Sequence, residues 1–119
     1  MKWFLLAVAL LHAVFMLLEM FPWESPFLLG LLSKKLHAGE AFTPQQRELV
    51  ATIVHNAGIY NGILAVGLVW AALTGESAHD VARALLAGAA VAGIFGTVTM
   101  RSVPTAVQGV LGIIGLLIL

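Results

Sequence analysis

The chain has no cysteine and very little charge. Only 10% of its 119 residues are charged, and six basic residues balance six acidic ones, so the formal net charge is zero. The lack of cysteine excludes disulfides and thiolate chemistry, and the lack of net positive charge gives no electrostatic basis for binding nucleic acid. Hydrophobic residues make up 61% of the chain, against about half in a soluble domain. This composition, with a mean hydropathy of +1.00, predicts a membrane protein.

Four apolar segments have lengths suited to a bilayer. A helix crosses a hydrocarbon core of about 30 Å with roughly 20 residues. The four segments are residues 3–21, 49–73, 81–100 and 103–119. Because no polar-rich linker separates them, they predict one integral membrane domain over residues 1–119, an all-α four-transmembrane-helix bundle. Lys2 and the residues after it resemble a signal peptide, but the apolar run continues to Phe21, so we interpret it as a retained first span.

Helix-start signals stand in the gaps between these segments. A capping hydroxyl followed by proline or by a capping-box residue marks each gap. The signals are Ser25-Pro26, Thr43-Pro44 with Gln46, Ser77–Asp80, and Ser102 with Pro104 after a tight turn at Arg101. The one long connection, residues 22–48, predicts a short helix lying in the membrane interface.

Lysine and arginine counts give an expected orientation. The residues on the long-connection side are Lys34, Lys35, Arg47 and Arg101, against Lys2 and Arg83 on the other side. The positive-inside rule then places the long connection in the cytoplasm and both termini on the non-cytoplasmic side.

Small residues recur at helical spacing in the last two segments. They form the pairs Ala89 with Gly93 and Ala92 with Gly96, and the series Gly109, Gly112 and Gly115. Small residues let membrane helices approach closely. The pattern favours close packing within one chain, and a homo-oligomer is the alternative.

Polar residues inside the segments are few, and they are expected to converge toward one side of the bilayer. They are His12, Glu19, Thr52, His55, Asn56, Tyr60, Asn61, Arg101 and Gln108. Matching depths along antiparallel segments predicts Thr52, His55 and Asn56 level with Glu19, and Tyr60 and Asn61 level with His12. A buried carboxylate needs a partner or a cavity, because it costs several kcal/mol in hydrocarbon. We therefore predict a polar pocket for a ligand or a proton, with His55, Arg101 or water beside Glu19.

The same residues also have structural interpretations. Glu19 could reach interfacial water or pair with Arg101, His12 could be a hydrogen-bonded core residue, and the amides could join helices at roughly 0.6 kcal/mol each. His37 and His79 fall outside the segments and are expected to be solvated. The ligand spacing of Glu19, His12 and His55 does not suit a metal site, and the sequence indicates no cofactor.

One stretch of the second segment resembles a known family. The run from Asn56 to Gly62, together with His12, Glu19, Trp23 and Pro26, is similar to small bacterial membrane proteins known only as the domain-of-unknown-function family number thirteen-oh-four. The family has glutamine where this chain has Ala57, and His55 is a candidate to replace it. The resemblance covers nearly the whole chain and implies a four-span bundle, a bacterial inner-membrane location, and a polar signature. It implies no activity.

Three functions stay open from the sequence. The first is binding or transport of a small molecule, lipid or proton at the polar pocket. The second is a membrane-embedded enzyme that shuttles protons on a lipid-soluble substrate, as an isomerase does. The third is a structural or accessory membrane subunit. The expected partners are membrane lipid, a small-molecule ligand and a second copy of the chain, with no nucleic acid.

Overall fold

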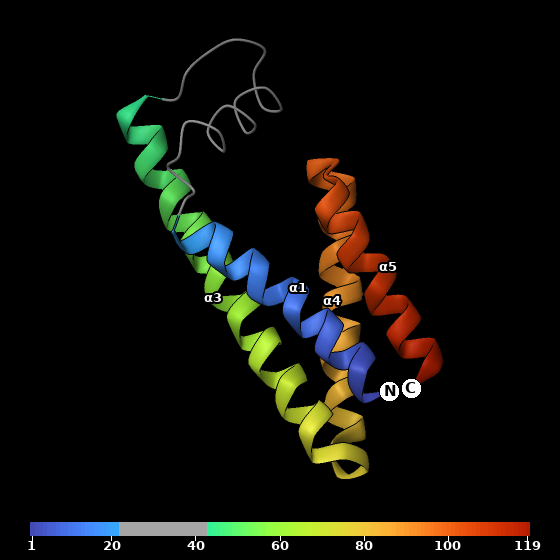
Figure 1. The fold of residues 1–119 in the computed structure, drawn as a ribbon. Coiled ribbons are helices and arrows are strands. Elements are labelled where there is room, and N and C mark those ends of the chain that lie inside the picture. Colours follow the sequence, from blue (N-terminus) through green and yellow to red (C-terminus); the bar gives the residue numbers. More distant parts are fainter. Residues whose placement is uncertain (22–42) are drawn as a thin grey trace. The chain divides into compact units, whose positions relative to one another are not determined.

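The computed structural model describes residues 1–21 and 43–119, and every regular element in these ranges is a helix (Figure 1). The elements are α1 (Lys2–Met20), α3 (Pro44–Thr74), the 3-10 helix η1 (Gly75–Ala78), α4 (His79–Met100) and α5 (Val103–Ile118). The all-α class is confirmed, and each of the four apolar segments is helical. The predicted interfacial helix and the Ser25-Pro26 signal lie outside the described residues.

Helix α3 begins with the predicted capping box, five residues before the predicted apolar segment. The Thr43 backbone N–H donates to Gln46 Oε1 at 2.9 Å, and the Gln46 N–H donates to Thr43 Oγ1 at 3.2 Å. These reciprocal bonds satisfy donors that a helix start otherwise leaves unpaired. As a result α3 has 31 residues, about 46 Å at 1.5 Å per residue, which is more than one bilayer core requires.

The turn between α3 and α4 differs from the prediction. Ser77 lies inside η1, and α4 begins after an N-cap at Ala78 with no side-chain capping bond. The predicted capping box at Ser77 is therefore wrong. The reversal is made instead by Gly75, whose φ of 78° is open to glycine because it has no Cβ.

The turn between α4 and α5 is as tight as predicted. Arg101 ends α4 in the left-handed conformation, with φ 49° and ψ 44°, and its N–H donates to Thr97 O at 3.0 Å. Ser102 is the N-cap of α5 and is followed by a proline in the first turn. Proline suits this place because its fixed φ is helical and its missing N–H is not needed.

Small residues bring α4 and α5 together along an antiparallel contact. A Cβ built on Gly93 would meet the main chain of Gly109, and one on Gly112 would lie 2.5 Å from Ala90 N. Backbone therefore packs on backbone, as expected of small residues between membrane helices. The prediction of close packing is confirmed for Ala89, Gly93 and Gly96, whereas Ala92 is exposed.

The chain divides into two compact units. Unit 1 comprises Met1–Ala13 and Ile63–Leu119, and unit 2 comprises Val14–Gly62. The core of unit 1 joins the first half of α1, the second half of α3, and α4, with Phe4, Leu111 and Leu116 packed against it. Its buried members are Leu5, Val8, Ala9, Leu68, Ala71, Ala72, Ala78, Ala82 and Leu86.

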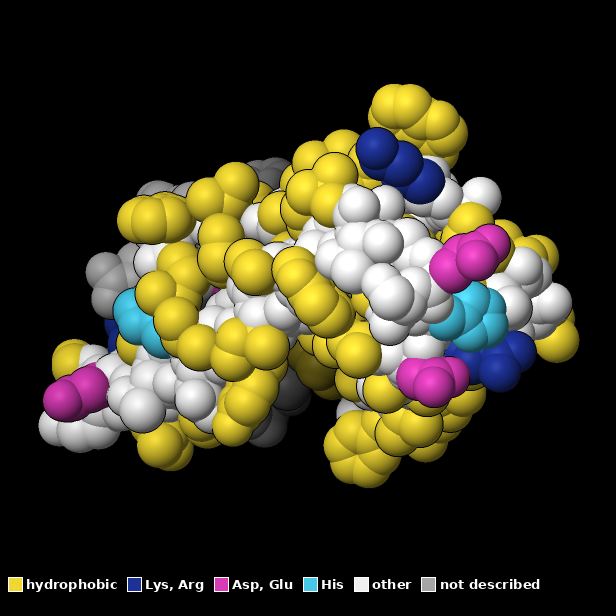
Figure 2. All heavy atoms as spheres, turned by 90° about the horizontal axis from the view of Figure 1, so that it is seen from below, with side chains coloured by type: hydrophobic (Ala, Val, Ile, Leu, Met, Phe, Trp, Pro, Cys, Tyr) yellow, Lys and Arg dark blue, Asp and Glu magenta, His cyan; other side chains and the backbone are white. Residues whose placement is uncertain are grey.

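Most of the large apolar side chains in the described part of the chain lie outside, and the interior is built mainly from small ones. Among the described residues, eight of the twelve buried hydrophobic side chains are alanine, whereas large apolar side chains such as Trp3 (79% exposed) and Leu117 (80% exposed) lie outside. Figure 2 shows hydrophobic side chains spread across the visible face among backbone and other side chains, with the charged side chains in small separate patches. Soluble proteins rarely expose apolar patches on this scale.

By length and composition, two helical stretches of the described chain could cross a membrane. One is α1, and the other is the continuous run Pro44–Met100, which contains α3, η1 and α4. Helix α5 is apolar but shorter. These stretches are consistent with a membrane location.

Candidate functional site

The most specific polar contact in unit 2 joins α1 to α3. Asn61 Nδ2 donates a hydrogen bond to Glu19 Oε2 at 2.7 Å, and the pair is partly buried. A bond of this length to a carboxylate is charge-assisted and stronger than a neutral one. Within residues 1–21 and 43–119, this is the only hydrogen bond of the Glu19 carboxylate. The second carboxylate oxygen is thus left as an acceptor.

Two glycines of α3 allow this close approach. A Cβ on Gly58 would lie 3.0 Å from Met20 Sδ and 3.2 Å from Glu19 Cβ, and one on Gly62 would lie 2.7 Å from Met16 Sδ. Gly58 and Gly62 are one helical turn apart and flank Asn61 on the face that meets α1. The glycines therefore bring α3 near enough for the short Asn61 side chain to reach Glu19.

The predicted depths of the polar residues are wrong for Asn61. Asn61 bonds Glu19, although depth matching predicts it level with His12. Since Met20, the last residue of α1, packs on Gly58, residues 44–57 of α3 continue beyond the end of α1 by about 20 Å. Depth matching assumes that the two helices begin and end together, and the long start of α3 breaks that assumption.

The other predicted polar residues of α3 form no hydrogen bond with Glu19 in the described part of the chain. Thr52 is exposed and its hydroxyl donates to Glu48 O at 3.0 Å within the helix. Asn56 is exposed, Tyr60 is 62% exposed, and His55 is half-buried. Among the described residues the partner of Glu19 is Asn61 rather than His55. The predicted stripe of Thr52, Asn56 and Tyr60 therefore exists, but it faces away from α1.

Unit 1 holds two further predicted residues in its interior. His12 is fully buried (0% exposed) and Gln108 is nearly so (8%). Gln108 belongs to the buried face of α5 with Gly109, Gly112 and Gly115. Burial of a polar side chain among alanines and glycines costs free energy unless the side chain forms hydrogen bonds. His12 and Gln108 are the buried polar side chains among the described residues of unit 1.

Arg101 and the threonines of α4 have local roles. Arg101 is exposed at the end of α4. Thr97 donates to Gly93 O at 2.6 Å and Thr99 donates to Phe95 O at 2.8 Å, both one turn back in the same helix. Such bonds satisfy a hydroxyl within its own helix, and Thr97 Oγ1 also lies 3.5 Å from Thr105 Oγ1 of α5.

His79 is a residue that the sequence does not identify as part of a site, because it lies between two apolar segments. It is half-buried rather than solvated, and its Nε2 lies 2.7 Å from the main-chain oxygen of Leu119. The signal that could have found it is its place at the start of α4, where the chain reverses. In the described ranges no group of three or more histidine, aspartate or glutamate side chains gathers to hold a metal ion.

Comparison with known proteins gives a family but no activity. A family model described as "Protein of unknown function (DUF1304)" matches residues 6–119. A protein of Lactococcus lactis subsp. lactis (strain IL1403), described as "Uncharacterized protein YpaA", is 31% identical over 72 residues. That match spans 60% of this chain and 60% of the relative. No solved structure matches the chain. The family resemblance predicted from the polar signature is confirmed.

Proposed function

The chain belongs to the DUF1304 family of proteins of unknown function, and from that premise we propose that it is a four-span integral membrane protein that binds a ligand at the Glu19–Asn61 pair. The observation that carries the proposal is the 2.7 Å hydrogen bond between these two side chains. It joins α3 to α1, a helix whose other titratable side chains are Lys2 and His12. A specific polar contact in such surroundings is a candidate for function as well as for packing.

The membrane placement is supported by the surface of the helices. An exposed surface of large apolar side chains over an interior of alanine, glycine, His12 and Gln108 suits lipid as the solvent. The apolar run Pro44–Met100 contains two crossings rather than one, because Gly75 reverses the chain between α3 and α4. With α1 and the shorter α5, this gives four spans.

The Glu19–Asn61 pair lies at the end of one helix and in the interior of the other. Glu19 is the second-last residue of α1, whereas α3 continues about 20 Å beyond the end of α1. The pair is only partly buried. This partial exposure favours binding over a sealed interior bond.

The ligand class follows from the acceptor that the pair presents. Asn61 occupies Oε2 of Glu19 and holds the carboxylate in place, while Oε1 accepts no hydrogen bond from the described residues. A carboxylate accepts hydrogen bonds and attracts positive charge. The proposed ligand is therefore a small molecule or lipid that carries a hydrogen-bond donor.

Loss of ligand in a Glu19→Gln variant tests the proposal. The introduced amide keeps an oxygen for Asn61 but replaces the remaining acceptor with an N–H₂ group, so the fold persists while the site is lost. Native mass spectrometry of protein extracted in mild detergent should show a bound mass on the wild type. We expect the variant to retain roughly tenfold less of it, because a hydrogen bond to a charged group contributes about 1.5–3 kcal/mol.

Glu48→Gln is the matched control for this experiment. Glu48 is exposed in the early turns of α3, and its substitution makes the same change of charge. This variant should retain the ligand at the wild-type level. Equal retention by Glu19→Gln and wild type, or a wild type that never carries a bound mass, would overturn the binding site and favour the structural role.

Single cysteines test the four spans and the orientation. Since the chain has no cysteine, Glu76→Cys and Arg101→Cys each introduce one thiol, and the two thiols lie at opposite ends of α4. We expect a membrane-impermeant maleimide to modify the Glu76→Cys variant in intact cells and the Arg101→Cys variant only after permeabilisation. Labelling of both from one side would contradict a crossing by α4, whereas the reverse pattern would contradict only the orientation.

A further inference from the structure

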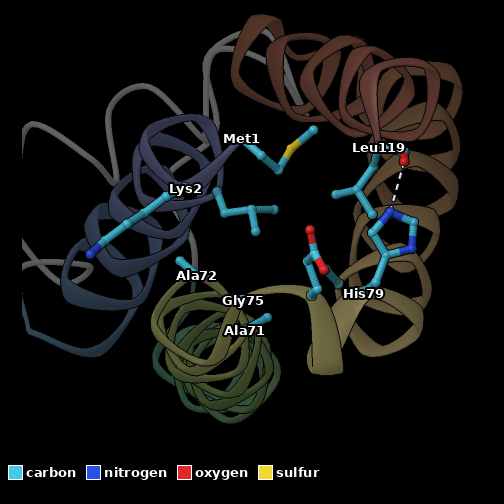
Figure 3. Close-up of a pocket in the computed structure, with 10 residues that line it drawn as sticks. Met1, Lys2, Ala71, Ala72, Gly75, His79 and Leu119 are labelled. Carbon is cyan, nitrogen blue, oxygen red and sulfur yellow. Dashed lines mark hydrogen bonds between the residues drawn. The ribbon is translucent and has the colours of Figure 1, made fainter.

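Unit 1 contains a cavity at the end where α3 turns into α4. Its volume is about 290 Å³, and it is bounded by α1, the end of α3, η1, the start of α4 and Leu119 (Figure 3). Leu5, Ala71, Ala72 and Ala82 form buried apolar walls, while Glu76 and His79 contribute polar groups. A pocket with apolar walls and few polar groups is the usual form of a small-molecule site.

His79 fixes one wall of this cavity. Its Nε2 lies 2.7 Å from the main-chain oxygen of Leu119 (Figure 3). A carbonyl oxygen only accepts hydrogen bonds, so Nε2 carries the hydrogen and donates it. The bond joins the beginning of α4 to the residue after α5. His79 is therefore a positioning residue of the cavity.

The groups around the cavity carry both signs of charge. Glu76 supplies a carboxylate, and the Leu119 oxygen is an acceptor. Met1 and Lys2 also line the cavity, and Figure 3 shows the Lys2 side chain extending away from His79 and Leu119. A zwitterion that offers an ammonium group to Glu76 and an anionic group to the ammonium groups of Met1 and Lys2 would be complementary to these charges.

We infer that this cavity binds the primary ammonium of a phosphatidylethanolamine headgroup. The inference rests on the membrane placement proposed above, because that placement puts the α3–α4 turn at the level of the headgroups. A primary ammonium donates three hydrogen bonds, and Glu76 accepts them. The methylenes of the headgroup then lie against Leu5 and Ala82. A trimethylammonium group has no N–H to donate, so phosphatidylcholine is expected to bind less tightly.

Lipid retention in detergent tests the inference with full-length protein. The wild type is mixed separately with palmitoyl-oleoyl phosphatidylethanolamine, with the phosphatidylcholine of the same chains, and with free phosphoethanolamine, and adducts are counted by native mass spectrometry. We expect phosphatidylethanolamine to be retained roughly fivefold over phosphatidylcholine, in keeping with about 1 kcal/mol for an ion pair near the surface. Glu76→Gln should remove that preference, and Asp80→Asn should keep it. Asp80 is a matched control because it is exposed in the next turn and does not line the cavity.

Each outcome decides one point. Equal retention of the two lipids by wild type, or an unchanged preference in Glu76→Gln, overturns the headgroup site. Binding of free phosphoethanolamine as strongly as of the lipid shows a site for a soluble amine and overturns the lipid assignment. Alkaline carbonate treatment of membranes is run in parallel, because release of the protein by carbonate overturns the membrane placement itself. Persistence in carbonate-washed membranes together with equal lipid retention overturns the headgroup site alone.

Discussion

Gly93→Ala is expected to destabilise the protein by on the order of 3 kcal/mol, since overpacking typically costs about 1–3 kcal/mol and here it meets backbone. The added Cβ would strike the main-chain N and Cα of Gly109 and lie 2.8 Å from Thr105 O. A side chain could rotate away, but the backbone of α5 cannot do so without leaving α4. The measurement is the midpoint temperature of unfolding in detergent, which is monitored by size-exclusion chromatography of heated samples.

Gly88→Ala is the matched control for this substitution. Gly88 lies in the same helix, and apart from its chain neighbours and the adjacent helical backbone nothing in the described structure lies within 4 Å of a Cβ built on it. The change should be neutral, or stabilising by up to about 1 kcal/mol because alanine favours helix over glycine. A Gly93→Ala protein as stable as Gly88→Ala would show that α4 and α5 are not packed backbone to backbone.

The helices could be predicted from the sequence because each apolar segment is long and continuous. A backbone in apolar surroundings must pair its N–H and C=O groups, and a helix pairs them within one segment. Long apolar runs therefore become helices and the gaps between them become turns. The boundary at Thr43 followed from a capping box that is local in sequence. At Ser102 the helix begins as predicted, with a proline in its first turn but without a side-chain capping bond. The capping box predicted at Ser77 is not formed, because the chain turns at Gly75 and Ser77 lies inside η1.

The site could be predicted only as a set of residues and not as a set of contacts. Glu19 and Asn61 both stand out in the sequence, but whether they meet depends on the rotation and sliding of α1 against α3, which hydropathy does not encode. The glycines at 58 and 62 contained that information, since a short amide reaches a neighbouring helix only where the backbones approach closely. The bond between His79 and Leu119 joins residues 40 positions apart, and no local pattern predicts it.

Asn61→Leu is expected to lose about 1.5–3 kcal/mol of stability, because it removes the donor to a partly buried carboxylate. The double variant Glu19→Leu/Asn61→Leu should be more stable than Asn61→Leu, and close to wild type, since replacing both partners with apolar groups leaves no unsatisfied charge. Unfolding free energies in detergent for the wild type, both single variants and the double variant complete the cycle. Asn56→Leu is the control, an exposed amide of the same helix, with an expected change within about 0.5 kcal/mol.

This cycle separates what the Glu19–Asn61 bond does for the fold from what it does for a ligand. If leucines at both positions leave the protein as stable as wild type, the bond is not needed to hold α1 against α3, and packing of Met16 and Met20 on the two glycines suffices. A partly buried pair that the fold does not need, with one carboxylate oxygen unoccupied by the described residues, is then explained by what it binds. A double variant that is several kcal/mol less stable than either single one would reverse this conclusion and make the pair a structural link.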